Sequence, residues 1–179
     1  MKTYLFLFLF GLSSLISLNA QQQDEAAYMK TLTDRSQKIV NTLNICDTAI
    51  YNRVTEILVN QYKSLGLIHD SSDTEDAKNL KLYSLHCEFI GKLSSELTPE
   101  QIDAVKDGMT YGVVKVTYNS YCNKIPALKP EEKRQLMAWL VEAREHAMDA
   151  ASSEKKHEWF GKYKGRFNNY LSKRGYDIK

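Results

Sequence analysis

The spacing of apolar residues predicts that the chain folds into five or six helices. Apolar residues that recur every three or four positions form one face of a helix, whereas a strand alternates apolar and polar positions. Helical spacing recurs over the segments 24–43, 47–66, 76–93, 99–121, 130–150 and 153–173. No linker between them is long enough to divide the chain into domains. We therefore expect an all-α fold, built as a single compact bundle.

The fourth of these segments, 99–121, has an ambiguous pattern. Thr98 precedes Pro99, and Gln101 follows at the third helical position, which is typical of a helix start with a capping box. The run 113–121 is rich in Val, Thr and Tyr, which favour strands. Because the apolar residues keep helical spacing from the cap onward, we predict one helix buried near the centre of the bundle.

The first twenty residues have a different pattern, typical of a secretory signal peptide. Lys2 precedes an apolar run that starts at Leu5, and the small residue Ala20 follows its end. The run is too short and too weakly flanked to persist as a transmembrane helix. We expect cleavage of residues 1–20 and a mature helical domain of residues 21–179, located in the periplasm or secreted and not inserted in a membrane.

Composition and cysteine content exclude several classes of function. The 24 Lys and Arg residues nearly balance the 22 Asp and Glu residues, so no concentrated basic face is expected for nucleic acid. Cys46, Cys87 and Cys122 form no CxxC or Cys/His cluster, so we expect no metal site, and no motif indicates a cofactor. The simplest interpretation is that all three cysteines are small buried hydrophobic residues, although one disulfide is possible. The oligomeric state is left open.

The fifth segment holds the densest set of ionisable residues. At about 100° per residue, Glu142, His146 and Asp149 share one flank of the helix. A histidine between carboxylates suits proton transfer, although a solvated flank with local ion pairs is the simpler alternative. Arg144 lies across the apolar stripe and must either snorkel or find a carboxylate. The candidate catalytic residues of this segment are Glu142, Arg144, Glu145, His146 and Asp149.

The sixth segment combines aromatic, basic and small residues. Aromatic rings interleaved with Arg, Lys and Asn suit sugars or acidic groups, although an aromatic core with an exposed basic flank is an equal alternative. The candidate ligand-binding residues are Trp139, His146, His157, Trp159, Tyr163, Lys164, Arg166 and Asn169. Gly161 and Gly165, like Gly108 and Gly112 in the fourth segment, are four residues apart. These pairs predict an unusually close approach of a neighbouring helix at one or both places.

The sequence resembles domain-of-unknown-function family thirty-eight twenty-six over nearly all of the mature chain. The residues that carry the resemblance are 51–54 (YNRV), 59–62 (VNQY), 107–114 (DGMTYGVV), 139–150 and 159–166 (WFGKYKGR). The resemblance implies an exported protein of Gram-negative gut bacteria whose relatives accompany polysaccharide-use genes. It implies no activity that can be assigned to particular residues.

A second, local resemblance concerns the start of the fourth segment. Residues 97–101 (LTPEQ) are similar to the Leu-Thr-x-x-Gln motif of the Spy/CpxP periplasmic chaperones, which are helical dimers. A related stretch, 128–132, departs from this motif at Lys129 and Glu132. Two helices that begin with the same Pro-Glu pattern would also explain the repetition.

Three functions are compatible with these patterns. We favour a periplasmic accessory protein of complex-glycan utilisation that binds a saccharide or an acidic oligosaccharide without catalysis. The first alternative is a glycan-active enzyme with Glu142, Glu145 or Asp149 as acid and base and Arg144 on a substrate carboxylate. That enzyme needs two carboxylates that converge on one cleft from different helices. The second alternative, a chaperone-like binder, needs an exposed apolar concave face.

Overall fold

The computed structural model describes the backbone of residues 5–178 and the side chains of residues 22–178. Seven α-helices and one 3-10 turn form the regular structure of this part of the chain, which contains no strand. The all-α class is confirmed, and the expected count of five or six helices is too low. The expected signal peptide lies outside the residues whose side chains are described, so its removal stays a prediction.

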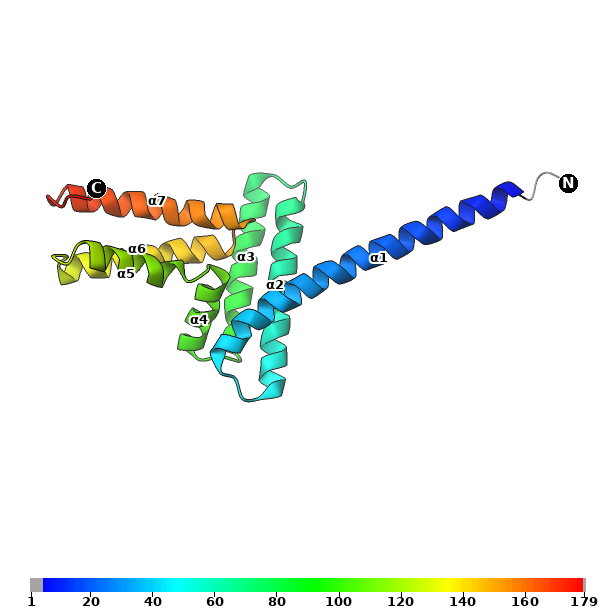
Figure 1. Ribbon diagram of the computed structural model, residues 1–179, viewed down its shortest axis with the longest axis horizontal. Helices are drawn as coiled ribbons and strands as arrows, with labels where there is room; N and C mark the ends of the chain where they lie inside the picture. The colour runs from blue at the N-terminus through cyan, green and yellow to red at the C-terminus, as the bar shows by residue number, and fades with distance from the viewer. Residues whose placement is uncertain (1–4, 179) are drawn as a thin grey trace.

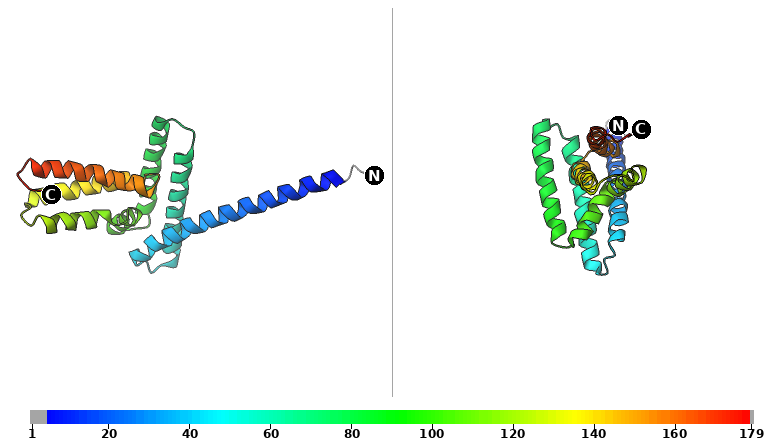
Figure 2. Two further views of the ribbon diagram at one scale, coloured as in Figure 1. Left: turned by 45° about the horizontal axis from the view of Figure 1, so that its top comes forward. Right: turned by 90° about the vertical axis from the view of Figure 1, so that its left-hand side faces the viewer.

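The helices form two groups that run in different directions (Figure 1). Helices α2 and α3 lie side by side, and α1 packs against α2 and projects beyond it, while α5, α6 and α7 run across the direction of α2 and α3 (Figure 2). The elements are α1 (Leu5–Val40), η1 (Asn41–Leu43), α2 (Thr48–Asp70), α3 (Glu75–Ser94), α4 (Pro99–Met109), α5 (Val113–Lys124), α6 (Pro130–Met148) and α7 (Ser153–Ser172). Within residues 22–178, no helix is long and apolar enough to cross a membrane.

The start of α4 follows the sequence prediction. The Thr98 side chain accepts from the Gln101 backbone N–H, and the Gln101 side chain accepts from the Thr98 N–H, so the capping box is complete. Pro99 occupies the first turn, where its missing N–H leaves no bond unmade. Gln101 also donates from Nε2 to the carbonyl of Leu43 at 3.1 Å, which ties the start of α4 to η1.

The predicted single helix 99–121 is in fact two helices, α4 and α5. Tyr111 and Gly112 follow α4 with φ angles of 60° and 66°, both left-handed. The Gly112 N–H donates to the carbonyl of Asp107 at 2.8 Å, and the Tyr111 N–H donates to that of Gly108 at 3.4 Å. This is the Schellman pattern that ends a helix. The sequence pattern missed this helix end for two reasons. The apolar spacing continues through the break, and the left-handed residue directly after the cap is Tyr111 instead of the usual glycine.

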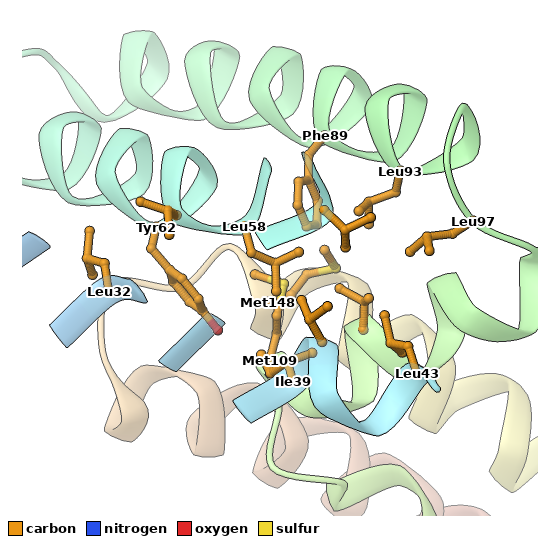
Figure 3. Close-up of a cluster of buried hydrophobic side chains, with 14 residues drawn as sticks. Leu32, Ile39, Leu43, Leu58, Tyr62, Phe89, Leu93, Leu97, Met109 and Met148 are labelled. Carbon is orange, nitrogen blue, oxygen red and sulfur yellow. The ribbon is translucent and has the colours of Figure 1, made fainter. Parts of the chain in front are cut away.

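The two groups of helices enclose two hydrophobic clusters that share α6. The first cluster lies among α1, α2, α3 and α4 and includes the wholly buried Leu58 and Leu93 (Figure 3). The second cluster lies among α5, α6 and α7 and includes the wholly buried Phe167 and Leu171. Helix α6 supplies Leu136, Leu140, Ala143 and Ala147 to the second cluster and Met148 to the first. The arrangement therefore differs from the single compact bundle that we expected.

The predicted close approach of helices occurs at Gly108 and not in α7. A Cβ atom added to Gly108 would lie 2.9 Å from Cγ2 of Ile39, so α4 touches α1 here. Apart from the chain neighbours and the backbone of its own helix, no atom lies within 4 Å of the corresponding position at Gly161 or Gly165, so the close approach occurs at one of the two predicted places and not in α7. Gly112 has open space as well, and its left-handed conformation explains the glycine there.

We expect Gly108→Ala to destabilise the protein by about 1 kcal/mol, although alanine favours helices. Crowding against the β-branched side chain of Ile39 costs roughly 1–3 kcal/mol, which exceeds the helix-propensity gain of about 1 kcal/mol. Gly161→Ala is the matched control and should be neutral or stabilising. Urea unfolding of both variants checks this, and an equal gain in stability for both would show that α1 and α4 are not in close contact.

The cysteines differ from the simplest sequence interpretation. All three are free thiols in the structure; Cys46 and Cys87 are exposed, and Cys122 is half-buried. The interpretation as buried hydrophobic residues is therefore wrong for Cys46 and Cys87. The bundle is held together by helix packing and ion pairs without a crosslink between these thiols.

Candidate functional site

A cleft of about 710 Å³ opens between the two groups of helices. Its volume falls in the range of small-molecule sites, roughly 300–1,000 Å³. One wall is formed by the end of α2 and the first part of α3, with His69, Tyr83 and His86. The opposite wall is formed by the end of α6 and the start of α7, and its members are Glu145, His146, Asp149, Lys155 and Trp159.

Asp149, directly after α6, joins the two walls. Its Oδ2 atom accepts a hydrogen bond from His86 Nδ1 at 2.7 Å, and its backbone carbonyl accepts one from His69 Nε2 at 2.8 Å. Its other carboxylate oxygen, Oδ1, is buried and has no hydrogen-bond partner in the described part of the chain. A single residue thus links α6 to both α2 and α3.

His86 lies between two carboxylates at the base of the cleft. While Nδ1 bonds to Asp149, Nε2 lies 3.6 Å from Glu145 Oε2, which is longer than a hydrogen bond. The hydrogen bond to Asp149 is the main cause that raises the pKa of His86 above its ordinary value, and burial opposes this rise. Asp149 fixes the neutral ring with its proton on Nδ1, so Nε2 is left for another partner.

Lys156 supports the same end of α6 from α7. Its side chain is buried, and Nζ donates to the carbonyl of Met148 at 3.1 Å. A cation suits this position because the carbonyls at a helix C-terminus carry partial negative charge. Burial lowers the pKa of Lys156 to about 8, and the nearby charge of Asp149 opposes this change.

Glu145 connects the cleft to a buried arginine. Its Oε2 atom accepts from Lys106 Nζ at 2.8 Å, and Oε1 lies 3.5 Å from Arg144 Nη2. The Arg144 side chain is only 5% exposed and donates to Asp103 at 2.6 Å and to Asp107 at 2.7 Å, both from α4. The expectation that Arg144 finds a carboxylate is confirmed.

A second hollow, of about 540 Å³, lies between α4, α5 and α6. Its charged lining is largely the ion-pair network just described, with Lys106 and Arg144, and its apolar lining includes Tyr118 and Met137. Because these charges are already paired with one another, the cleft, where His86 Nε2 has no hydrogen-bond partner among the described residues, is the better candidate for a ligand site.

The aromatic residues of α6 and α7 form a cluster in which cations cover the rings. Trp159 stacks on His146 with 4.5 Å between ring centroids, and Lys162 Nζ lies 4.3 Å from the Trp159 centroid. The Arg166 guanidinium lies 5.1 Å from the Trp139 ring and 5.7 Å from the Tyr163 ring. Such cation–π contacts satisfy the cations within the protein.

The structure therefore separates the predicted site residues. Glu145, His146, Asp149 and Trp159 line the cleft, whereas Arg144 is buried behind it. Glu142 lies 3.7 Å from Arg166 in the aromatic cluster, and His157 stacks on Tyr111 with 5.8 Å between centroids. The predicted residues that do not line the cleft are Trp139, Glu142, Arg144, His157, Tyr163, Lys164, Arg166 and Asn169.

The residues that sequence reasoning missed come from the other wall and from α4. His69, Tyr83 and His86 face the cleft from α2 and α3. No local sequence pattern predicts these residues, because the partner of His86 is Asp149, 63 positions along the chain. Asp103 and Asp107 are four residues apart on one helix face, and this spacing predicts that a cation, here Arg144, binds between them. Within residues 22–178, no group of three His, Cys, Asp or Glu side chains is arranged to hold a metal ion.

Fold and site together define an all-α protein with a polar and aromatic cleft between two groups of helices. The chain belongs to the family described as Protein of unknown function (DUF3826), whose model matches residues 29–79 and 72–179. The expected membership of a family of unknown function is thus confirmed, and the likeness to Spy/CpxP chaperones stays a prediction. No curated protein matches the chain.

Proposed function

We propose that the protein binds an oligosaccharide in this cleft, as a periplasmic accessory protein of complex-glycan utilisation. The observation that carries the proposal is that one cleft combines an exposed aromatic ring, Tyr83, with polar groups from four helices. A concave site with convergent polar groups is where a ligand is expected in an all-helical protein.

Tyr83 supplies an aromatic face in the cleft that no cation covers. Its side chain is 73% exposed on α3, so its ring is accessible to a ligand in the cleft. On the other wall, Trp159 is held in place by its stacking on His146. Aromatic faces pack well against the apolar faces of sugar rings, because they bury hydrophobic area at small conformational cost.

The polar lining suits hydroxyl groups, which both donate and accept hydrogen bonds. His86 Nε2 has no hydrogen-bond partner among the described residues, and Asn79 adds an amide group to the lining. Lys155 adds an ammonium group that also pairs with Glu158 at 2.8 Å. Carboxylates on the α6 wall provide acceptors. Such a mixture fits a saccharide better than a purely apolar ligand.

The cleft carboxylates of α6 support binding more than hydrolysis. Glu145 and Asp149 come from the same end of α6, so an acid–base pair, which needs carboxylates that face a substrate from two sides, would have to use Asp70 or Glu75 of the opposite wall. Glu145 is engaged by Lys106 and Arg144, and Asp149 is engaged by His86. Neither carboxylate is free to act on a glycosidic bond in this arrangement.

We expect Tyr83→Ala to weaken oligosaccharide binding by about tenfold without loss of stability, because it removes an exposed stacking face. Isothermal titration with a panel of neutral and acidic hexasaccharides measures this. Tyr28→Ala is the control, since Tyr28 is an exposed tyrosine on α1 outside the cleft. An equal loss in both variants, or none in either, would place the site elsewhere.

The same samples separate the alternative functions. New reducing ends that disappear in Glu145→Gln or Asp149→Asn would identify a glycan-active enzyme. Failure to bind any saccharide, together with suppressed aggregation of an unfolded client protein, would identify a chaperone-like binder.

A further inference from the structure

Negative charge predominates in the lining of the cleft. Four carboxylates and two lysines line it, and these residues are Asp70, Glu75, Glu145, Asp149, Lys78 and Lys155. Protonation of His86, whose pKa is raised by its hydrogen bond to Asp149, adds one positive charge and still leaves the carboxylates in excess. A cleft lined by one sign of charge concentrates ligands of the opposite sign. The excess therefore favours a ligand that carries positive charge.

The charged groups behind the lining do not reverse this sign. They include as many carboxylates as cations, and most of them are paired with one another or with a lining residue. These groups are Lys81, Lys106, Arg144, Lys156 and Lys162, together with Asp73, Asp103, Asp107, Glu154 and Glu158. The net charge at the cleft is therefore the charge of its lining.

The helix ends at the cleft also oppose one another. Helices α2 and α6 end there, at Asp70 and Met148, with the partial negative charge of their last carbonyls. Helices α3 and α7 begin there, at Glu75 and Ser153, with the partial positive charge of their first N–H groups. Because two helices end and two begin, the side chains set the sign of the local charge.

Asp70 and Glu75 are the lining carboxylates that remain accessible to a ligand. Both are exposed, and Asp70 forms no ion pair within residues 22–178. Glu75 lies 4.0 Å from Lys78, whose Nζ atom donates instead to the His69 carbonyl at 3.0 Å. The two carboxylates of α6 are already engaged within the protein. A ligand ammonium can therefore donate charge-assisted hydrogen bonds to Asp70 and Glu75.

Tyr83 lies on the same helix face as Glu75. Glu75, Asn79 and Tyr83 follow one another at intervals of four residues on α3, and all three line the cleft. This spacing places them on one face over about 12 Å. A sugar ring can stack on Tyr83, whose exposed face also attracts cations, while an ammonium on a neighbouring sugar meets the carboxylates.

We propose that the cleft selects oligosaccharides that carry primary amines and disfavours those that carry carboxylates, with Asp70 and Glu75 as the residues that determine this specificity. The inference rests on the proposed function and adds the charge of the ligand. That charge is opposite to that of the acidic oligosaccharide that the sequence patterns suggested.

The test uses three hexasaccharides with one backbone and different charges. They are cellohexaose, its derivative with a primary amine on the exocyclic carbon of each sugar, and its derivative with a carboxylate there. Isothermal titrations of the full mature chain at about pH 7.5 and constant ionic strength compare them; at this pH the amines are protonated and the carboxylates ionised. We expect about tenfold tighter binding of the amine than of cellohexaose, and about threefold weaker binding of the carboxylate.

Two double variants assign the preference to the cleft. Asp70→Asn with Glu75→Gln should reduce the preference for the amine over cellohexaose to about threefold or less. The matched control, Glu56→Gln with Asp76→Asn, removes the same charge from exposed positions of α2 and α3 outside the lining, and it should keep the preference. Far-ultraviolet circular dichroism checks that both fold. If the first variant does not fold, the comparison of the three probes on the wild-type protein still decides.

The outcomes separate this inference from the proposed function. Equal binding of the amine and cellohexaose, tighter binding of the carboxylate than of cellohexaose, or a preference that survives in the folded cleft variant overturns the inference and leaves the proposed function standing. Absence of binding by all three probes and by every member of the hexasaccharide panel overturns the two together.

Discussion

Replacing both Asp103 and Asp107 by Asn is expected to destabilise the protein by about 3 kcal/mol, because it removes the two negative charges that pair with a buried arginine. The Arg144 side chain is 5% exposed, and without these two carboxylates it keeps the bond of 3.4 Å to the Asp103 backbone carbonyl and the contact of 3.5 Å with Glu145. A guanidinium cannot lose its proton to escape the cost of burial. The loss should appear as a lower midpoint of urea unfolding.

The complementary variant, Arg144→Met, should cost only about 1 kcal/mol. The side chains of Asp103 and Asp107 are 64% and 38% exposed, so water solvates them when the arginine is absent. Methionine fills much of the same apolar volume between α4 and α6. A larger loss for Arg144→Met than for the double Asn variant would contradict this asymmetry.

Phe167→Ala is expected to destabilise the second cluster by roughly 3–5 kcal/mol. Phe167 is wholly buried and meets the edge of Tyr121 with 4.9 Å between ring centroids and that of Trp139 with 6.1 Å. Its removal leaves a cavity among α5, α6 and α7 that rigid aromatic neighbours cannot fill.

Phe167→Leu is the control, since it keeps most of the volume, and it should cost about 1 kcal/mol. Thermal unfolding followed by far-ultraviolet circular dichroism measures both variants, and tryptophan fluorescence reports on Trp139 beside the cavity. A loss below about 1 kcal/mol for the alanine variant would show that the cluster collapses around the gap.

Sequence patterns predicted the features that depend on local interactions. The capping box at Thr98 and Gln101 needs only residues three positions apart, and the helical class follows from spacing within each segment. The end of α4 was missed because Tyr111 takes the left-handed position, where a glycine is the usual signal. One side chain in an unexpected backbone conformation thus divided a predicted helix into two.

The candidate site was predictable on one wall only. Glu145 and Asp149 share a helix face, so their proximity follows from helix geometry. His86 and Tyr83 come from α3, and their position opposite α6 depends on how the two groups of helices pack. The position of Arg166 also depends on helix packing. We predicted it as a ligand-binding residue, and its guanidinium lies over the Trp139 ring of the neighbouring helix instead.

Met148 and Asp149 are consecutive residues with different surroundings. Met148 is wholly buried in the first cluster, and Asp149 holds His69 and His86 at the cleft. A ligand that binds only the folded cleft therefore depends on the packing of α1–α4 as well as on that of α6 and α7. Its binding stabilises both groups of helices by mass action. Heat resistance in the presence of ligand would then be a property of the whole helical assembly, and local opening of either group of helices would release the bound molecule.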